Sequence, residues 1–175
     1  SEEKVAVDYC QIMFSQKNGD TWSEPEAIDL GDNAQNYVHP VLSEDGKMLI
    51  FACNKEEGFG GYDLYYSIKI GADDEAKWSV PINLGNKINT DGNEVFPFLD
   101  KDTLYFSSDG HIGMGGLDIF RVEKKAHKWQ VPQNLKAPMN SGGDDFGFIL
   151  DLLNPLPEGS IQHGYFSSNR IGGLG

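Results

Sequence analysis

Short apolar stretches alternate with turn residues along the whole chain. The stretches are rich in Val, Ile, Phe and Tyr, and each is bounded by Gly, Asn, Asp or Pro, as β-strands are. They begin near residue 11, at Lys47, at Asp63, at Thr103 and at Gly164. No long segment places apolar residues at i, i+3, i+4 and i+7 without interruption by glycine, as an amphipathic helix would. The pattern predicts an all-β fold.

Three sequence markers recur in the same order, which indicates an internal repeat. A block with a phenylalanine, a double glycine and an aspartate recurs at an offset of 55: Phe51, Gly60-Gly61 and Asp63, then Phe106, Gly115-Gly116 and Asp118. Residues 166–175 begin a third copy of this block. A tryptophan segment starts at Trp22, Trp78 and Trp129, with offsets of 56 and 51. The segment Asn36–Leu42 aligns with Asn93–Leu99 and, more loosely, with Asp144–Leu150.

Each repeat of 51 to 57 residues contains four strand-sized pieces, which is the size of a β-propeller blade. One twisted four-stranded sheet cannot bury both faces alone, whereas sheets packed side by side around an axis cover one another. We therefore expect residues 1–175 to form a single segment of a β-propeller with four-stranded antiparallel blades. Residues 1–35 would end one blade, 36–88 and 89–139 would form two complete blades, and 140–175 would start the next. Because a closed propeller needs at least about four blades, we expect a fragment of a larger propeller with open sheet edges at both ends.

The recurring residues themselves are expected to be structural, since a catalytic residue normally occurs once. The double glycines would allow a tight return between the second and third strands. The aspartate that follows would accept amide hydrogens of this glycine loop, with a metal or catalytic role as the alternative. The tryptophans would fill the space between neighbouring blades. The predicted structural residues are Gly60, Gly61, Asp63, Trp78, Gly115, Gly116, Asp118 and Trp129, and Trp22 is placed with the tryptophans.

Composition narrows the possible partners. Fourteen Lys and Arg stand against 27 Asp and Glu, which gives a formal net charge of −13. Such an acidic surface repels phosphate backbones, so nucleic acid is not an expected partner. No apolar run reaches the roughly 20 residues of a membrane span, and no basic-then-apolar leader opens the chain, so direct membrane insertion is not expected. Cys10 and Cys53 are interpreted as two small buried hydrophobes, or else as one disulfide in an oxidising compartment.

No catalytic constellation stands out in the sequence. The segment from Ser15 to Trp22 resembles the Asp-box turn of sialidases, but Lys17 occupies the Asp position, and the chain has only two of the three arginines those enzymes use. A Gly-x-Ser-x-Gly elbow of a serine peptidase is absent from the sequence. Two-carboxylate glycoside hydrolysis stays open, because the acids Glu94, Asp109, Asp144 and Asp145 could line one face.

Metal binding has weak support. The four histidines, His39, His111, His127 and His163, lack the short spacing of a zinc site. The loop from Asn89 to Glu94 offers hard oxygen ligands that could hold calcium, but without the EF-hand spacing. Asn and Asp that cap their own turns are the simpler interpretation. We expect no metal and no other cofactor, with calcium as the alternative.

The first repeat reads Pro40-x-x-Ser43-x-Asp45-Gly46-Lys47 and continues to Phe51, which resembles the TolB-like propeller repeat. The blocks TLYFSSDGHIGMGGLDIF and GYFSSNRIGGLG are similar to repeats of Bacteroidota outer-membrane-associated proteins of the OmpA family, including PorE-like proteins of the type IX secretion system. In these proteins the propeller lies between tetratricopeptide repeats and a peptidoglycan-binding domain, neither of which is present in this sequence. Kelch propellers share the double glycine and the tryptophan but lack the Ser-x-Asp-Gly-Lys turn.

The resemblance implies a periplasmic, outer-membrane-associated scaffold that binds protein partners of the cell envelope and reaches peptidoglycan only through a separate domain. A non-catalytic interaction module is therefore the expected function, and the propeller of a sialidase-like or glycosidase-like enzyme is the alternative. Loops that vary between copies would bind the partner, because regular blades present their loops at one end of a rigid frame. The predicted partner-binding residues are Asn36, His39, Asn93, Glu94, Phe96, Asp109, His111, Asp144 and Asp145.

Overall fold

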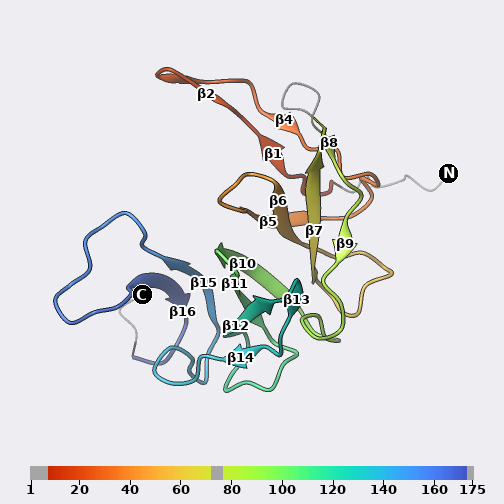
Figure 1. Ribbon diagram of the computed structural model, residues 1–175. Helices are drawn as coiled ribbons and strands as arrows, with labels where there is room; N and C mark the ends of the chain where they lie inside the picture. The colour runs from red at the N-terminus through yellow and green to blue at the C-terminus, as the bar shows by residue number, and fades with distance from the viewer. Residues whose placement is uncertain (1–7, 72–76, 173–175) are drawn as a thin grey trace.

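The computed structural model describes residues 8–71 and 77–172, and these residues form antiparallel β-sheets without any helix (Figure 1). The all-β prediction is confirmed. Because the described ranges contain no helix at all, they contain none that could cross a membrane. Within these ranges the sheets do not close into a ring or barrel.

Two complete sheets follow each other along the chain. The first contains β5 (Tyr37–Leu42), β6 (Met48–Cys53), β7 (Asp63–Ile70), β8 (Lys77–Trp78) and β9 (Ile82–Asn83). The second contains β10 (Glu94–Asp100), β11 (Thr103–Ser108), β12 (Asp118–Lys125), β13 (Lys128–Trp129) and β14 (Gln133–Asn134). In both, the short last strands continue each other along the outer edge of the third strand, so each sheet is four strands wide.

Two half sheets flank the complete ones in sequence. On the N-terminal side β1 (Met13–Phe14) pairs with β4 (Glu26–Ala27), and β2 (Lys17–Asn18) pairs with β3 (Thr21–Trp22). Together they form a long hairpin that extends away from the other sheets (Figure 1). Its strands correspond to the third and fourth strands of a complete sheet. On the C-terminal side β15 (Asp145–Leu150) pairs with β16 (Gly164–Ser168), which correspond to the first and second strands.

The turn between β5 and β6 shows how the sequence sets the hairpin. Gly46 has a φ of +68°, a left-handed conformation that glycine adopts without a steric penalty. The Asp45 carboxylate accepts hydrogen bonds from the Ser43 hydroxyl at 2.7 Å and from the Lys47 amide at 3.1 Å. Side-chain oxygens therefore take the place of backbone partners in the turn.

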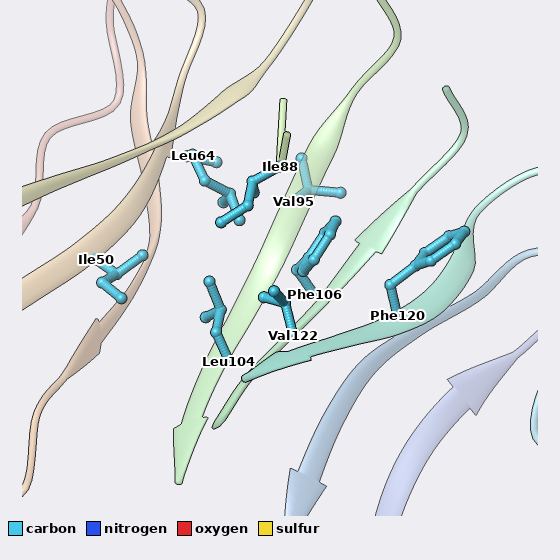
Figure 2. Close-up of a cluster of buried hydrophobic side chains, with 9 residues drawn as sticks. Ile50, Leu64, Ile88, Val95, Leu104, Phe106, Phe120 and Val122 are labelled. Atoms are coloured by element: carbon cyan, nitrogen blue, oxygen red, sulfur yellow. The ribbon is translucent and has the colours of Figure 1, made fainter. Parts of the chain in front are cut away.

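Successive sheets pack face to face, which buries both faces of each complete sheet. Figure 2 shows Ile50 and Leu64 of the first sheet directed towards Val95, Leu104 and other side chains of the second. Ile12 and Leu30 of the N-terminal segment cover the opposite face of the first sheet, and Phe148 and Leu150 of β15 cover that of the second. The residues of β6 from Leu49 to Cys53 are consequently all buried, because neighbours lie on both sides of the strand.

The first strand of each sheet carries a bulge at one recurring position. The pairing register shifts between Val38 and Val41, between Val95 and Phe98, and between Phe146 and Ile149. The residue at the shift has a positive φ in all three strands: His39 at 53°, Phe96 at 52° and Gly147 at 67°. Two of the three are not glycine, so this backbone conformation stores strain that the surrounding contacts must offset.

Two sequence expectations differ from the structure. Trp22 is 65% exposed and fills no space between sheets. Trp78 and Trp129 are partly buried, and each packs towards the sheet that precedes its own, whereas no sheet precedes that of Trp22 in the described residues. The cysteines are both free, but only Cys53 is buried, because Cys10 lies on the exposed edge of the N-terminal segment.

Candidate interaction surface

At each junction between successive sheets, one Asn or Asp side chain accepts a hydrogen bond from the backbone of the preceding sheet. Asn93 Oδ1 accepts the Tyr62 amide at 3.1 Å, Asp144 Oδ1 accepts the Leu117 amide at 2.9 Å, and Asn36 Oδ1 accepts the Cys10 amide at 2.8 Å. The next residue along the chain donates its amide to the carbonyl of the same partner in all three cases. These three predicted partner-binding residues therefore occupy equivalent positions and link one sheet to the next.

The same side chains pair with a residue at the end of the second strand. Asn93 donates its amide and its Nδ2 to the two oxygens of Asp109 at 2.6 and 2.9 Å. At the following junction the residue types are exchanged: the Asp144 amide donates to Asn169 Oδ1 at 2.6 Å, and Asn169 Nδ2 donates to Asp144 Oδ2 at 2.7 Å. The geometry is kept while donor and acceptor change places.

A second recurring side chain, an asparagine, forms hydrogen bonds to the backbone of the third strand in each complete sheet. Asn89 Oδ1 accepts the Leu64 amide at 2.8 Å, and its Nδ2 donates to the Leu64 carbonyl at 3.0 Å. Asn140 makes the equivalent bonds to Ile119 at 2.8 and 2.9 Å. Both asparagines are buried, and each adds side-chain hydrogen bonds to a strand residue whose carbonyl also accepts a backbone amide, from Leu84 or Leu135.

Glu94 and Asp145, two further predicted partner-binding residues, have no exposed surface. Glu94 accepts hydrogen bonds from the Thr90 amide and hydroxyl and from the Ser108 hydroxyl, at 2.6 to 2.8 Å. Asp145 accepts equivalent bonds from Ser141. Neither carboxylate reaches a partner from this position, because each is enclosed by the chain that precedes and follows it.

The two buried carboxylates differ in their charge environment. Burial raises the pKa of Glu94, and the hydrogen bonds from Ser108 and Thr90 only partly oppose this effect. Burial acts on Asp145 in the same direction, but hydrogen bonds from Ser168, Arg170 and Ser141 hold its pKa below the ordinary value. Arg170 contributes to this lowering, since its Nη2 lies 2.6 Å from Asp145 Oδ1, whereas Gly110 stands at the corresponding position beside Glu94.

The glycine loops pack against the following junction without space for a side chain. A Cβ added to Gly60 would lie 2.1 Å from the Gly92 carbonyl oxygen, and one added to Gly115 would lie 2.2 Å from that of Gly143. Asp63 accepts amide hydrogens of its loop from Phe59 at 2.6 Å and from Gly60 at 3.2 Å. Asp118 accepts those of Met114 and Gly115. These contacts agree with a structural role of both aspartates.

An aromatic row crosses the first strands of three successive sheets. The His39 and Phe96 rings stack with centroids 3.9 Å apart, and the Phe96 and Phe146 rings stack at 5.1 Å. Burial lowers the pKa of His39, which favours the neutral ring in this row. His111 lies elsewhere: its Nε2 donates to the Ile88 carbonyl oxygen at 2.8 Å, and its ring packs against Phe106 and Phe120. The predicted residues His39 and Phe96 therefore lie in contact, whereas His111 lies apart from them, at the junction between the first and second sheets.

Sequence reasoning missed a groove at the opposite end of the same strands. It has a volume of about 580 Å³ and lies where β5, β10 and β15 end. Its apolar lining includes Leu42, Phe98, Leu99 and Leu150, and Glu44, Asp100, Lys101 and Asp151 add charges to its walls. The chain between β15 and β16 forms one side, where Leu156 and Ile161 are 47% and 90% exposed.

The sequence did contain a signal for this groove. The third repeat carries an insertion around Asn154–His163, and this stretch with the residues just before it is rich in Leu and Ile. An exposed loop with several large aliphatic residues is typical of an interaction site rather than of a solvated turn. His163 anchors the loop, since its Nε2 lies 3.2 Å from Asp151 Oδ2, and hydrogen bonds from Asn154 hold the pKa of Asp151 far below the ordinary value.

The described residues contain no group of three or more His, Cys, Asp or Glu side chains placed to hold a metal ion. The loop proposed for calcium uses its Glu94 oxygens for the Thr90 and Ser108 hydrogen bonds. Asp109 and Asp144, the remaining candidates for a carboxylate pair, are each bonded to an asparagine. The groove is a candidate binding surface that uses none of these residues.

No protein-family model matches the sequence, and neither the curated proteins nor the solved structures include a significant match.

Proposed function

We propose that the chain is a β-propeller segment that acts as a non-catalytic protein-interaction module of the cell envelope, on the periplasmic side of the outer membrane. The radial arrangement is supported by sheets that pack face to face and by first strands β5, β10 and β15 that are neighbours. The location and the link to an outer-membrane assembly such as the type IX secretion system rest on the resemblance of the repeats alone.

The groove at the ends of the first strands carries the proposal. Rigid sheets form its floor, and an exposed aliphatic loop forms its wall, which is the combination expected of a surface that recognises a protein segment. The net charge of −13 and the three carboxylates of the groove favour a partner segment that combines apolar side chains with Lys or Arg. The loops that the sequence predicted to bind a partner form the junctions between sheets, at the opposite end of the same strands.

The test is site-specific photo-crosslinking in cells. A photoreactive amino acid at Leu156 in the groove is expected to give a discrete adduct with one envelope protein. The matched control is Val131, which is 73% exposed and lies outside the groove. Adducts at Met114 but not at Leu156 would show that the partner binds the loops predicted from the sequence, since Met114 belongs to the glycine loop, and not the groove. Absence of adducts at both Leu156 and Met114 would refute an interaction module.

The non-catalytic part of the proposal has its own test. The intact protein is assayed with fluorogenic sialosides and glycosides, and no turnover is expected. Turnover would instead establish a glycan-active enzyme, and Asp109 would be the first carboxylate to replace, since it is the most exposed of the four candidate acids. The folded state of Asp109→Asn would be checked by circular dichroism, because Asp109 also bonds to Asn93.

A further inference from the structure

The floor of the groove follows the repeat. One leucine from each of the first strands β5, β10 and β15 lines the groove, and these leucines occupy equivalent positions: Leu42, Leu99 and Leu150. The residue after each leucine is polar, and these three residues, Ser43, Asp100 and Asp151, also occupy equivalent positions. The strand ends therefore combine an apolar floor with one polar group from each sheet.

The three polar groups differ in their hydrogen bonds. The Ser43 hydroxyl donates within its own turn at 2.7 Å. Asp151 accepts a hydrogen bond from Asn154 Nδ2 at 2.7 Å and lies 3.2 Å from His163 Nε2. Asp100 is half-buried, and its carboxylate forms no hydrogen bond or ion pair with the residues that the structure describes. A half-buried carboxylate beside an apolar floor is stabilised by a cation that a partner brings.

An aromatic ring lies on the same face as this carboxylate. β10 pairs regularly with β11 from Phe98 to Asp100. Because side chains alternate along a strand, Phe98 and Asp100 point to the same face of the sheet. Phe98 is only partly buried, and both residues line the groove. A guanidinium suits this combination, since it pairs with a carboxylate through two parallel N–H donors and also packs on aromatic rings.

The neighbouring charges leave the sign of the groove to Asp100. Glu44 and Lys101 occupy the next equivalent position in the first and second repeats, and both line the groove with opposite charges. Their effects on a bound ion therefore oppose each other. The third repeat has Leu152 at this position, and its side chain is 67% exposed. A cation bound at Asp100 consequently has aliphatic neighbours.

We infer that the groove recognises its partner segment through one arginine, whose guanidinium pairs with Asp100 and lies against Phe98 while its methylene stem covers the leucine floor. This recognition rests on the function proposed above and names the partner chemistry of that site. Arginine is expected rather than lysine, because a guanidinium is more weakly hydrated than an ammonium group and loses less on leaving water. A segment without a cation would cover the Asp100 carboxylate and leave it without a bonding partner.

Photo-crosslinking from Leu156 in cells tests the role of Asp100. Asp100→Asn keeps the shape of the side chain but removes its charge, and it is expected to lower the adduct yield by about tenfold, since charge-assisted hydrogen bonds are the strong class. The matched control is Asp102→Asn. Asp102 is an exposed acid of the same turn and does not line the groove, so its replacement should leave the yield unchanged. Circular dichroism shows whether both variants remain folded.

Mass spectrometry of the Leu156 adduct identifies the partner segment, which is expected to contain an arginine close to the crosslinked residue. Replacing that arginine by glutamate should abolish the adduct, and combining this change with Asp100→Arg should restore it. An undiminished adduct in Asp100→Asn, or a segment without arginine, overturns the arginine recognition and leaves the interaction module standing. Absence of a Leu156 adduct from the chain that retains Asp100 instead overturns the groove as the binding site.

Discussion

Exchange of one asparagine for aspartate is predicted to loosen the junction between the two complete sheets. Asn93 receives the Tyr62 amide and donates twice to Asp109, so it joins the first sheet to the second. In Asn93→Asp the new Oδ1 can still accept the Tyr62 amide, as Asp144 accepts the Leu117 amide. The bond to Asp109 Oδ2 is lost, however, and two carboxylates face each other.

The magnitude follows from these contacts. The lost Nδ2 bond spans 2.9 Å and ends on a charged oxygen, and such bonds contribute about 1.5–3 kcal/mol. Because the pair is exposed, the lower end of this range applies. Two carboxylates about 4 Å apart in water-like surroundings repel each other by about 1 kcal/mol. We expect Asn93→Asp to lower the free energy of unfolding by about 2 kcal/mol.

The double variant Asn93→Asp with Asp109→Asn provides the decisive comparison, because it reproduces the arrangement of Asp144 and Asn169 at the next junction. Urea denaturation followed by circular dichroism is expected to show recovery of most of the lost stability. A double-mutant cycle should give a coupling energy of about 1–2 kcal/mol. Additive losses in the double variant would refute the idea that the pair acts as one exchangeable unit.

Three further outcomes are expected. Gly60→Ala should lower the free energy of unfolding by about 2–3 kcal/mol in urea denaturation, because its Cβ meets backbone, whereas Gly142→Ala, with nothing within 4 Å of its Cβ, should be neutral. Arg170→Gln should cost about 2 kcal/mol at neutral pH, since the buried Asp145 loses its cation. The folded pKa of Asp145 lies below its ordinary value, so its contribution is present above about pH 4 and is lost as the pH falls through the folded pKa. The unfolding free energies of Arg170→Gln and wild type, measured against pH, should therefore converge in acid. Ellman's reagent at pH 8 should label one thiol of the native chain and a second only in denaturant, because burial raises the pKa of Cys53 to about 11.

The repeat could be predicted from the sequence because turn and core residues recur at fixed spacing. The offset of 55 that relates Phe51 to Phe106 also relates β6 to β11 and β7 to β12, and the tryptophan offset of 51 relates β8 and β9 to β13 and β14. Short apolar stretches bounded by turn residues are sufficient for an all-β assignment, since strand pairing needs only their order and length. Whether the sheets are arranged around an axis depends on packing angles, which no residue pattern specifies.

The buried carboxylates could not be identified from composition. With 27 acidic residues in the chain, Glu94 and Asp145 resemble solvated loop residues, and only their hydroxyl partners distinguish them. A signal was present: Thr90 and Ser141 each stand four residues before the buried acid. The exposure of Trp22 has a different cause. Its identity matches the other tryptophans, but those pack against a preceding sheet, and the described residues contain no sheet before that of Trp22.

Variation between copies of a repeat is an unreliable sign of a binding surface. The residues before the first strands were predicted to bind a partner because they differ from copy to copy, yet at one junction an Asn–Asp pair and at the next an Asp–Asn pair form the same bonds. A pair that needs one donor and one acceptor tolerates exchange of its two members, so sequence differences accumulate while the geometry stays fixed. The loop that lines the groove differs from these junctions, because it does not recur. Its insertion occurs in only one repeat, has no counterpart that could share a structural role, and leaves aliphatic side chains such as Ile161 exposed. A feature present once in a repetitive fold is therefore the better indicator of function, for the same reason that recurrence indicates scaffold.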